Sequence, residues 1–358
     1  MSKRTNRVPA RALLVLILFD VLAPVNLNAQ ILQLVPSTHI DRAPQSFLDA
    51  CSSVQQWPTL YARTTYLGAV SWQLRPDRAT NSTLARCFSQ MNARNLQLSL
   101  EVGITGVVAT GLEAYQEGWA DWQRFQNLGA PLTAFFIDEP ITNSTRILGL
   151  SYATIVNETA NWIVLVRQNP RLTNIKLILI EAYPHLSAST IIDFINDVNN
   201  VAALHGVVGF DGLQIDHAWD GLKAWSGSDL GAMRAAAHNR RMEFSVIFYA
   251  AMPFPNPTND CDFRARLNQQ WNAYKVNGID YYGFYPDIYT IQSWDQLPSV
   301  TVPETTSACT FMQGAKQWLD AIDVVPPVRP GLYRPPSCQT PSAATLKTLL
   351  ACEQPALR

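Results

Sequence analysis

Charged side chains are scarce in this sequence of 358 residues. Lys, Arg, Asp and Glu together make up 15% of it, against roughly 25% in an average globular protein. The formal net charge is -1, and no run of Lys and Arg marks a basic surface, so nucleic acid is not an expected partner. A surface that is polar but carries few charges suits neutral polar ligands.

Signatures of several other protein classes are also missing. No glycine-rich turn follows an early apolar run, which argues against an open dinucleotide-binding sheet. The Gly-x-Ser-x-Gly motif of serine hydrolases is absent, and His39 stands alone, without the His-x-His pair of two-histidine metal hydrolases. None of the six cysteines forms a Cys-x-x-Cys pair, so a structural zinc site is not expected. We therefore predict neither a metal nor a cofactor.

Apolar stretches long enough to span a membrane are missing as well. Near the start of the chain, four cationic residues precede an apolar run from Ala12 to Phe19, and Ala29 supplies a small residue before Gln30. This pattern predicts a signal peptide over residues 1–29. Asp20 interrupts the run, and no later segment reaches the ~20 apolar residues of a spanning helix. We expect a secreted or periplasmic protein without a membrane span.

The six cysteines agree with an oxidising compartment. The first two predicted disulfides would tie neighbouring helices, and the third would close a loop near the end of the chain. The predicted pairs are Cys51–Cys87, Cys261–Cys309 and Cys338–Cys352.

Eight short apolar runs alternate with segments that have helical periodicity. Such runs are typical of strands buried in a parallel sheet. The predicted strands are Ile31–Val35, Leu67–Gln73, Gln97–Val102, Thr133–Asp138, Lys176–Glu181, Gly212–His217, Glu243–Tyr249 and Ile279–Phe284. This alternation predicts an α/β fold, a (β/α)8 (TIM) barrel over residues 30–325.

The segments between these strands carry helix signals. Predicted helices are Pro44–Gln56, Ala188–Val201, Asp229–Arg241 and Asp262–Val276. The triplets Asn81-Ser82-Thr83 and Asn143-Ser144-Thr145 resemble helix N-caps. From Val324 onward prolines crowd the chain, which predicts that residues 326–358 form a proline-rich, disulfide-closed extension packed on the barrel.

Acidic side chains gather at the carboxyl ends of the predicted strands. They are Glu101, Asp138, Glu139, Glu181, Asp216 and Asp287. In this type of barrel all carboxyl ends meet at one face, which carries the active site. Each acid alone has a structural explanation, such as capping the next helix. Clustered carboxylates raise one another's pKa and reduce stability, so we do not expect all of them to be structural.

Aromatic side chains accompany these acids. A flat ring with a polar edge fits the C–H face of a sugar, although ordinary core packing explains most aromatics in a barrel. The predicted substrate-binding residues are Trp72, Glu101, Tyr183, His217, Trp219, Tyr249 and Tyr285.

One segment carries a family resemblance. A barrel with paired acids at its strand ends resembles the (β/α)8 glycoside hydrolases, and Asp138-Glu139-Pro140 is similar to the Asn-Glu-Pro that ends strand four in many retaining members. The resemblance implies that Glu139 is the general acid/base. Two departures stand out: Asp138 replaces the Asn, and Phe248-Tyr249-Ala250 stands where the family has a nucleophilic Glu on strand seven.

Other barrel glycosidases pair acids from strands four, five and six. We therefore predict a glycoside hydrolase acting on a neutral oligo- or polysaccharide, with Glu139 as general acid and Asp216 or Glu181 as nucleophile or base. Asp138 would orient or tune this pair.

Two alternatives stay open. One is a non-catalytic glycan-binding barrel. The other is a magnesium-dependent enolase-type barrel, with Glu101, Asp138 or Glu139, and Glu181 as ligands. In that case His217 is the candidate base.

Overall fold

The computed structural model describes residues 31–104, 110–217, 226–249, 258–275, 285–305 and 309–322. His217 is described by its backbone alone. The predicted signal peptide, Trp219, the predicted extension over 326–358 and the Cys338–Cys352 pair lie outside these residues.

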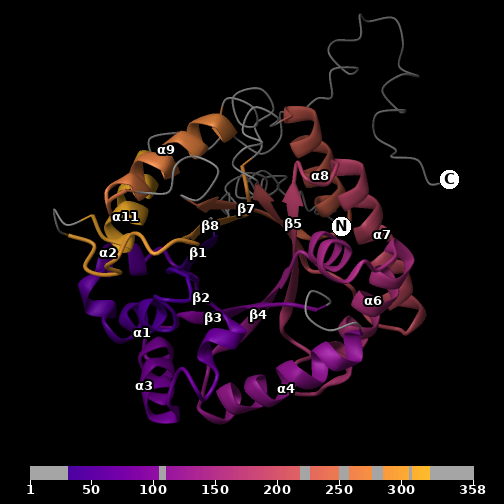
Figure 1. Ribbon diagram of the computed structural model, residues 1–358, viewed down its shortest axis with the longest axis horizontal. Helices are drawn as coiled ribbons and strands as arrows, with labels where there is room; N and C mark the ends of the chain where they lie inside the picture. Colours follow the sequence, from indigo (N-terminus) through magenta and orange to yellow (C-terminus); the bar gives the residue numbers. More distant parts are fainter. Residues whose placement is uncertain are drawn as a thin grey trace, which may run out of the picture. The chain divides into compact units, whose positions relative to one another are not determined.

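The strands form a closed parallel barrel in chain order, with β8 returning to pair with β1. They are β1 (Ile31–Val35), β2 (Tyr66–Val70), β3 (Gln97–Val102), β4 (Leu132–Asp138), β5 (Lys176–Tyr183), β6 (Gly212–His217), β7 (Glu243–Tyr249) and β8 (Ile288–Gln292). Figure 1 looks down this barrel and shows helices arranged around the strands. The predicted TIM barrel is confirmed.

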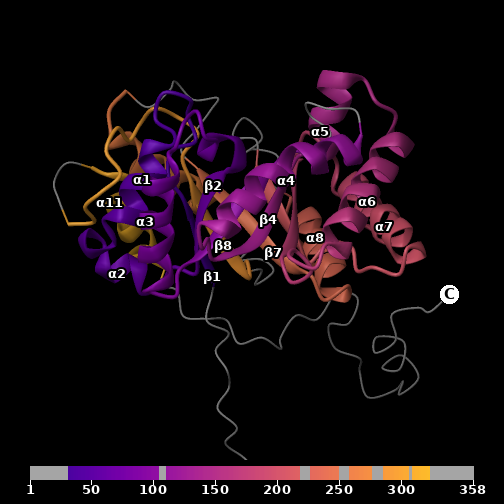
Figure 2. The ribbon, with the colours of Figure 1, turned by 90° about the horizontal axis from the view of Figure 1, so that it is seen from below.

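Helices follow the strands along the chain. They are α1 (Gln45–Ser52), α2 (Pro58–Tyr61), α3 (Asn81–Asn92), α4 (Gly111–Asn127), α5 (Pro140–Asn143), α6 (Tyr152–Gln168), α7 (Ala188–Leu204), α8 (Gly227–Asn239), α9 (Asp262–Tyr274) and α11 (Phe311–Ile322). Short 3-10 turns, η1 (Val54–Gln56) and η2 (Ser71–Leu74), and a π-helical turn, η3 (Ser144–Leu148), complete them. In the side view of Figure 2, the short helix α5 lies toward one end of the barrel.

Hydroxyl side chains cap many of the longer helices. The cap of α3 is Thr80, one residue before the predicted triplet. The triplet at Asn143 was a wrong prediction, because Asn143 ends α5 and the next long helix is capped by Ser151. In each case the side-chain oxygen accepts a backbone N–H of the first turn, which would otherwise have no partner.

The eighth strand was predicted at the wrong place. The structure puts it at Ile288–Gln292, whereas the predicted run over 279–284 lies outside the described residues. Tyr285 and Asp287 therefore precede β8 and lie at its amino end, not at the catalytic face as predicted. Asp287 Oδ2 accepts the N–H of Phe244 at 2.8 Å and lies 2.7 Å from His238 Nε2, which makes it a structural residue of the opposite face.

Two apolar clusters build the core. The larger lies between the strands and the helices. The smaller fills the barrel itself and includes Ala134, Phe136, Ile178, Ile180 and Ile247. Side chains that alternate along each strand divide between these two clusters.

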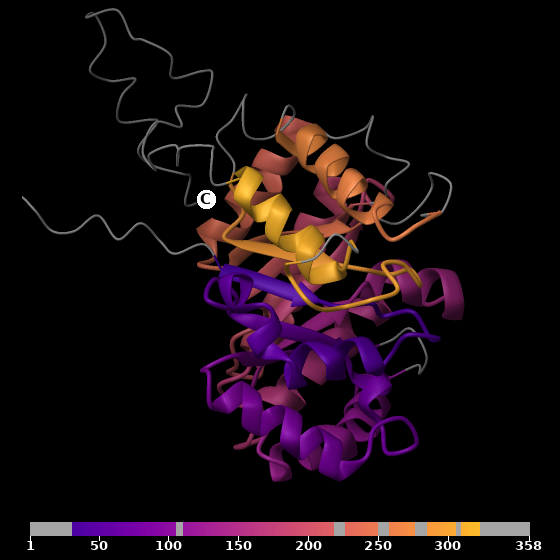
Figure 3. The same cartoon turned by 90° about the vertical axis from the view of Figure 1, so that its left-hand side faces the viewer.

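Both disulfides predicted within the described residues are present. Cys51–Cys87 joins α1 to α3, and Cys261–Cys309 joins the start of α9 to the segment before α11. Figure 3 faces the side where α11 lies close to α9. Disulfides of this kind form in an oxidising compartment. Among the described helices, none is both long and apolar enough to cross a bilayer.

Candidate active site

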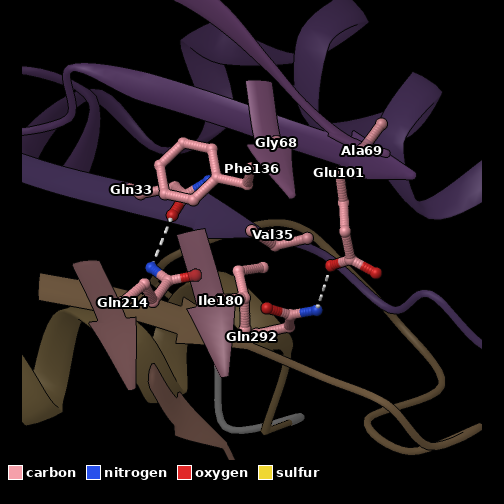
Figure 4. Close-up of a pocket in the computed structure, with 9 residues that line it drawn as sticks. All are labelled: Gln33, Val35, Gly68, Ala69, Glu101, Phe136, Ile180, Gln214 and Gln292. Carbon is pink, nitrogen blue, oxygen red and sulfur yellow. Dashed lines mark hydrogen bonds between the residues drawn. The ribbon is translucent and has the colours of Figure 1, made fainter. Parts of the chain in front are cut away.

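Polar side chains line the barrel interior toward its carboxyl end. Figure 4 shows a pocket into which Glu101, Gln214 and Gln292 point from three different strands. Because side chains alternate along a strand, Asp216 faces the same way as Gln214, and Asp138 the same way as Phe136. The strands thus bring Glu101, Asp138 and Asp216 close together at the carboxyl end of the barrel.

Glu139 joins this cluster from the turn that follows β4. Its carboxyl group is hydrogen-bonded to that of Asp216, which also accepts a hydrogen bond from the Tyr249 hydroxyl. Burial raises the pKa of Glu139 to about 9, and the negative charges of Asp216 and Asp138 add to the rise. At neutral pH Glu139 therefore carries the proton of the hydrogen bond between the two carboxyl groups.

Asp216 is the partner in this pair. Burial raises its pKa to about 7, and the charge of Asp138 adds to the rise. The hydrogen bonds from Tyr249 and Glu139 act in the opposite direction, because they favour the ionised form. The pair thus consists of one carboxylic acid and one carboxyl group that ionises near neutrality.

Asp138 is the most acidic member of the cluster. Burial raises its pKa only to about 6, because it accepts a hydrogen bond from Asn143 Nδ2 at 3.1 Å and feels the charge of Arg146. Arg146 in turn donates to Asn143 Oδ1 at 3.1 Å. Glu101 is at the other extreme: burial, and then the charge of Asp138, raise its pKa well above the usual range.

Glu181 does not belong to this inward-facing group. It lies between Ile180 and Ala182 on β5, and Ile180 faces the barrel interior, so Glu181 faces outward. Its side chain is fully buried, and its two oxygens accept hydrogen bonds from Ile141 N–H and the Thr142 hydroxyl. This position contradicts the prediction that Glu181 is a nucleophile or base.

Tyr183 also faces outward, and the prediction that it binds substrate is wrong. Its side chain is 2% exposed and packs in the outer core. Its hydroxyl donates to Asp229 Oδ2 at 2.9 Å and accepts the N–H of Ser226 at 3.2 Å. These bonds join β5 to the start of α8 and leave no surface for a ligand.

The remaining predicted aromatics divide between the site and the loops. Tyr249 lies at the carboxyl end of β7, against the acid pair. Trp72 lies in η2, directly after β2, and is 36% exposed, with the Arg78 guanidinium 4.6 Å from its ring centroid. Trp219 and the His217 side chain lie outside the described residues.

Because the eighth strand was predicted too early in the chain, two residues of the site are missing from the sequence-based prediction. Gln292, the last residue of β8, donates from Nε2 to Glu101 Oε2 at 3.1 Å. Trp294, two residues further along, packs edge-on against Tyr249, with ring centroids 6.4 Å apart. Its indole N–H is buried and has no hydrogen-bond partner among the described residues. A correct eighth strand would have put both residues in the candidate site.

The enolase-type alternative loses one of its predicted ligands, because the oxygens of Glu181 are engaged with α5. In the part of the chain that the structure describes, no group of three or more His, Cys, Asp and Glu side chains is arranged to hold a metal ion.

No protein-family model matches the chain. No curated protein matches it either. An endo-beta-N-acetylglucosaminidase from Cordyceps militaris is 12% identical, with 82% of this chain and 91% of that chain covered and a TM-score of 0.44. Deoxyribose phosphate aldolase from Aeropyrum pernix is 10% identical, with coverages of 81% and 90% and a TM-score of 0.40.

A third similar structure is the carboxyl transferase domain of Rhizobium etli pyruvate carboxylase. It is 11% identical, with 82% of this chain and 47% of that chain covered and a TM-score of 0.43. These three proteins have unrelated activities. A fold does not fix a function, which depends on the residues of the site.

Proposed function

We propose that this protein is a secreted glycoside hydrolase that cleaves a neutral oligo- or polysaccharide, with Glu139 as the general acid. The observation that carries the proposal is the hydrogen-bonded pair of Glu139 and Asp216 at the carboxyl end of the barrel. Glycosidic cleavage needs a carboxylic acid that is still protonated at working pH, beside carboxylates that are ionised. The environment of Glu139 supplies the first, and Asp138 the second.

In this mechanism Glu139 protonates the glycosidic oxygen as the bond to the leaving sugar breaks. Positive charge then develops at the anomeric carbon, and the negative charge of Asp138 and Asp216 stabilises it. Asp216 touches Glu139, whereas the two carboxyl groups of a retaining or inverting pair stand at least ~5 Å apart. We therefore assign Asp216 no direct attack on the sugar. A water molecule adds to the anomeric carbon, and the proton that this water releases returns to Glu139 through Asp216.

The electrostatics of the site favour a neutral substrate. Glu101, Asp138, Glu139 and Asp216 meet at the same end of the barrel, and an anionic sugar would add a charge of the same sign. Tyr249 and Trp294 supply aromatic surface beside these acids. The two disulfides suit a protein that acts outside the cell.

The test is a screen for reducing-sugar release over a panel of neutral polysaccharides. We expect turnover with the wild type, and a loss of about 100-fold or more in kcat for Glu139→Gln, because general acid catalysis contributes ~10²–10⁴-fold. Asp216→Asn should lose activity as well, since the amide that replaces the carboxylate cannot take the proton.

The matched control is Asp287→Asn, at the amino end of β8. It removes a carboxylate of the same barrel on the opposite face, and its kcat should equal that of the wild type. Turnover that persists in Glu139→Gln would refute the assignment. Binding of a glycan without any turnover by the wild type would favour the non-catalytic barrel instead.

A further inference from the structure

The backbone of Glu139 is held in a conformation that residues other than glycine rarely adopt. Its φ is 39° and its ψ 56°, in the left-handed region. Its N–H donates to Ile180 O at 3.1 Å, and its carbonyl accepts the N–H of Asn143 at 2.8 Å. The side chain of the proposed acid therefore starts from a strained turn between β4 and α5, and neighbouring elements must hold that turn in place.

Glu181 supplies contacts that hold this turn. It follows Ile180 on β5 and is fully buried behind the barrel wall. Oε1 accepts the N–H of Ile141 at 2.8 Å, Oε2 accepts the Thr142 hydroxyl at 3.2 Å, and the carboxyl group also accepts the Thr142 N–H. These two N–H groups belong to the first turn of α5, where helical N–H groups have no partner within the helix.

We infer that Glu181 is a positioning residue, which fixes the first turn of α5 and thereby aims the carboxyl group of Glu139 into the barrel. The inference rests on the proposed role of Glu139 as the acid. Two adjacent residues of β5 act together: the carbonyl of Ile180 anchors the backbone of Glu139, and the side chain of Glu181 anchors the two residues after Pro140. A carboxyl group whose position depends on a strained turn loses its alignment when that anchor is removed.

Glu181 also acts on Glu139 through its charge. The charged groups that act on Glu139 are Asp138 from β4, Asp216 from β6 and, from the outward face of β5, Glu181, while Arg146 of η3 acts on Asp138. Burial raises the pKa of Glu181 to about 8. Glu181 is therefore ionised when Glu139 titrates near 9, and its negative charge contributes to the raised pKa of Glu139. Removing that charge should lower the pH at which Glu139 loses its proton.

Glu304 provides a matched control. It is also a buried glutamate, 3% exposed, that holds the start of a short helix. Its Oε1 accepts the N–H of Thr59 at 2.9 Å and its Oε2 the N–H of Leu60 at 2.8 Å, in the first turn of α2. Substitution at Glu304 removes the same kind of contact without touching the acid cluster.

The experiment compares Glu181→Ala, Glu181→Gln, Glu304→Ala and Glu304→Gln with the wild type. For Glu181→Ala we expect kcat to fall by about 100-fold with KM nearly unchanged, since small misalignments have effects of that order. Glu181→Gln keeps an acceptor for the Ile141 N–H and should recover part of kcat. In both variants the alkaline limb of the pH–rate profile should move to lower pH. The Glu304 variants should lose thermal stability, but their kcat and the alkaline limb of their pH–rate profile should match those of the wild type.

Wild-type kcat in Glu181→Ala, or parallel loss of activity and stability in the Glu181 and Glu304 variants, would overturn the inference. A wild type inactive on every glycan would refute the proposed function without deciding this question. In that case the pKa of the Glu139 carboxyl group is measured by infrared or NMR titration. A value that is the same in the wild type, Glu181→Gln and Glu304→Gln would overturn the inference.

Discussion

Gln292 Nε2 donates to Glu101 Oε2 over 3.1 Å, and so links the last residue of β8 to β3 across the barrel. Glu101 is buried, and this hydrogen bond opposes the rise of its pKa that burial and Asp138 cause. Gln292→Leu would leave the carboxyl group without this donor. We expect the free energy of unfolding to fall by about 1–3 kcal/mol, the usual effect of leaving a buried polar group unsatisfied.

Chemical denaturation of Gln292→Leu at two pH values checks this prediction. The loss should be larger in alkaline than in weakly acidic solution, because a protonated Glu101 depends less on a donor. The control is Gln296→Leu, four residues further along, where Gln296 donates to Asp41 on the surface. That variant should stay within about 0.5 kcal/mol of the wild type. Equal losses in both variants would contradict the prediction.

Most of the barrel could be predicted from the sequence, because parallel strands buried on both faces stand out as short apolar runs. The same property explains the errors. A strand that is apolar on both faces does not reveal which of its residues face inward, so the sequence predicts Glu181 and Tyr183 at the site together with Asp216. The run over 279–284 matches the strand pattern as well as Ile288–Gln292 does, and periodicity alone could not choose between them.

The stability of the protein should fall as the pH rises from about 4 to about 9. Asp138, Asp216, Glu181 and Glu139 have folded-state pKa values of about 6, 7, 8 and 9, all above those of unfolded carboxyl groups. The folded state therefore binds more protons than the unfolded state over this range, and its stability decreases with pH. Thermal unfolding followed at successive pH values measures the slope.

Asp216→Asn removes one of these titrations, and the decrease of the melting temperature with pH should become shallower. Asp287→Asn serves as the comparison, because the pKa of Asp287 is shifted in the opposite direction, downward. Although burial opposes it, contacts with His238 and Phe244 lower the pKa of Asp287, so this residue favours the folded state above the unfolded pKa. Asp287→Asn should destabilise the protein at neutral pH. If the change of melting temperature with pH has the same slope in Asp216→Asn as in the wild type, the pKa of Asp216 is not raised above that of an ordinary carboxyl group.

The pH–rate profile should be bell-shaped. Activity requires Asp138 and Asp216 ionised, with pKa values of about 6 and 7, and Glu139 protonated, with a pKa of about 9. Arg146→Gln removes the positive charge that lowers the pKa of Asp138, so the acidic limb should move to higher pH while the alkaline limb stays in place. Initial rates between pH 4 and 10 test this. An acidic limb that does not move would exclude Asp138 as one of the groups that must be ionised.

Trp294 should bind substrate through its indole N–H. That group is buried and has no hydrogen-bond partner among the described residues, and the ring packs against Tyr249, which is bonded to Asp216. Trp294→Phe keeps an aromatic ring and removes the donor. We expect KM to rise by about threefold to tenfold, since one hydrogen bond contributes ~0.5–1.5 kcal/mol.

Trp119→Phe on α4, where Trp119 stacks on Tyr115 outside the site, is the control and should leave KM unchanged. An unchanged KM in Trp294→Phe would show that the indole N–H does not face the ligand, and the aromatic surface for the sugar would then have to be sought at Trp72.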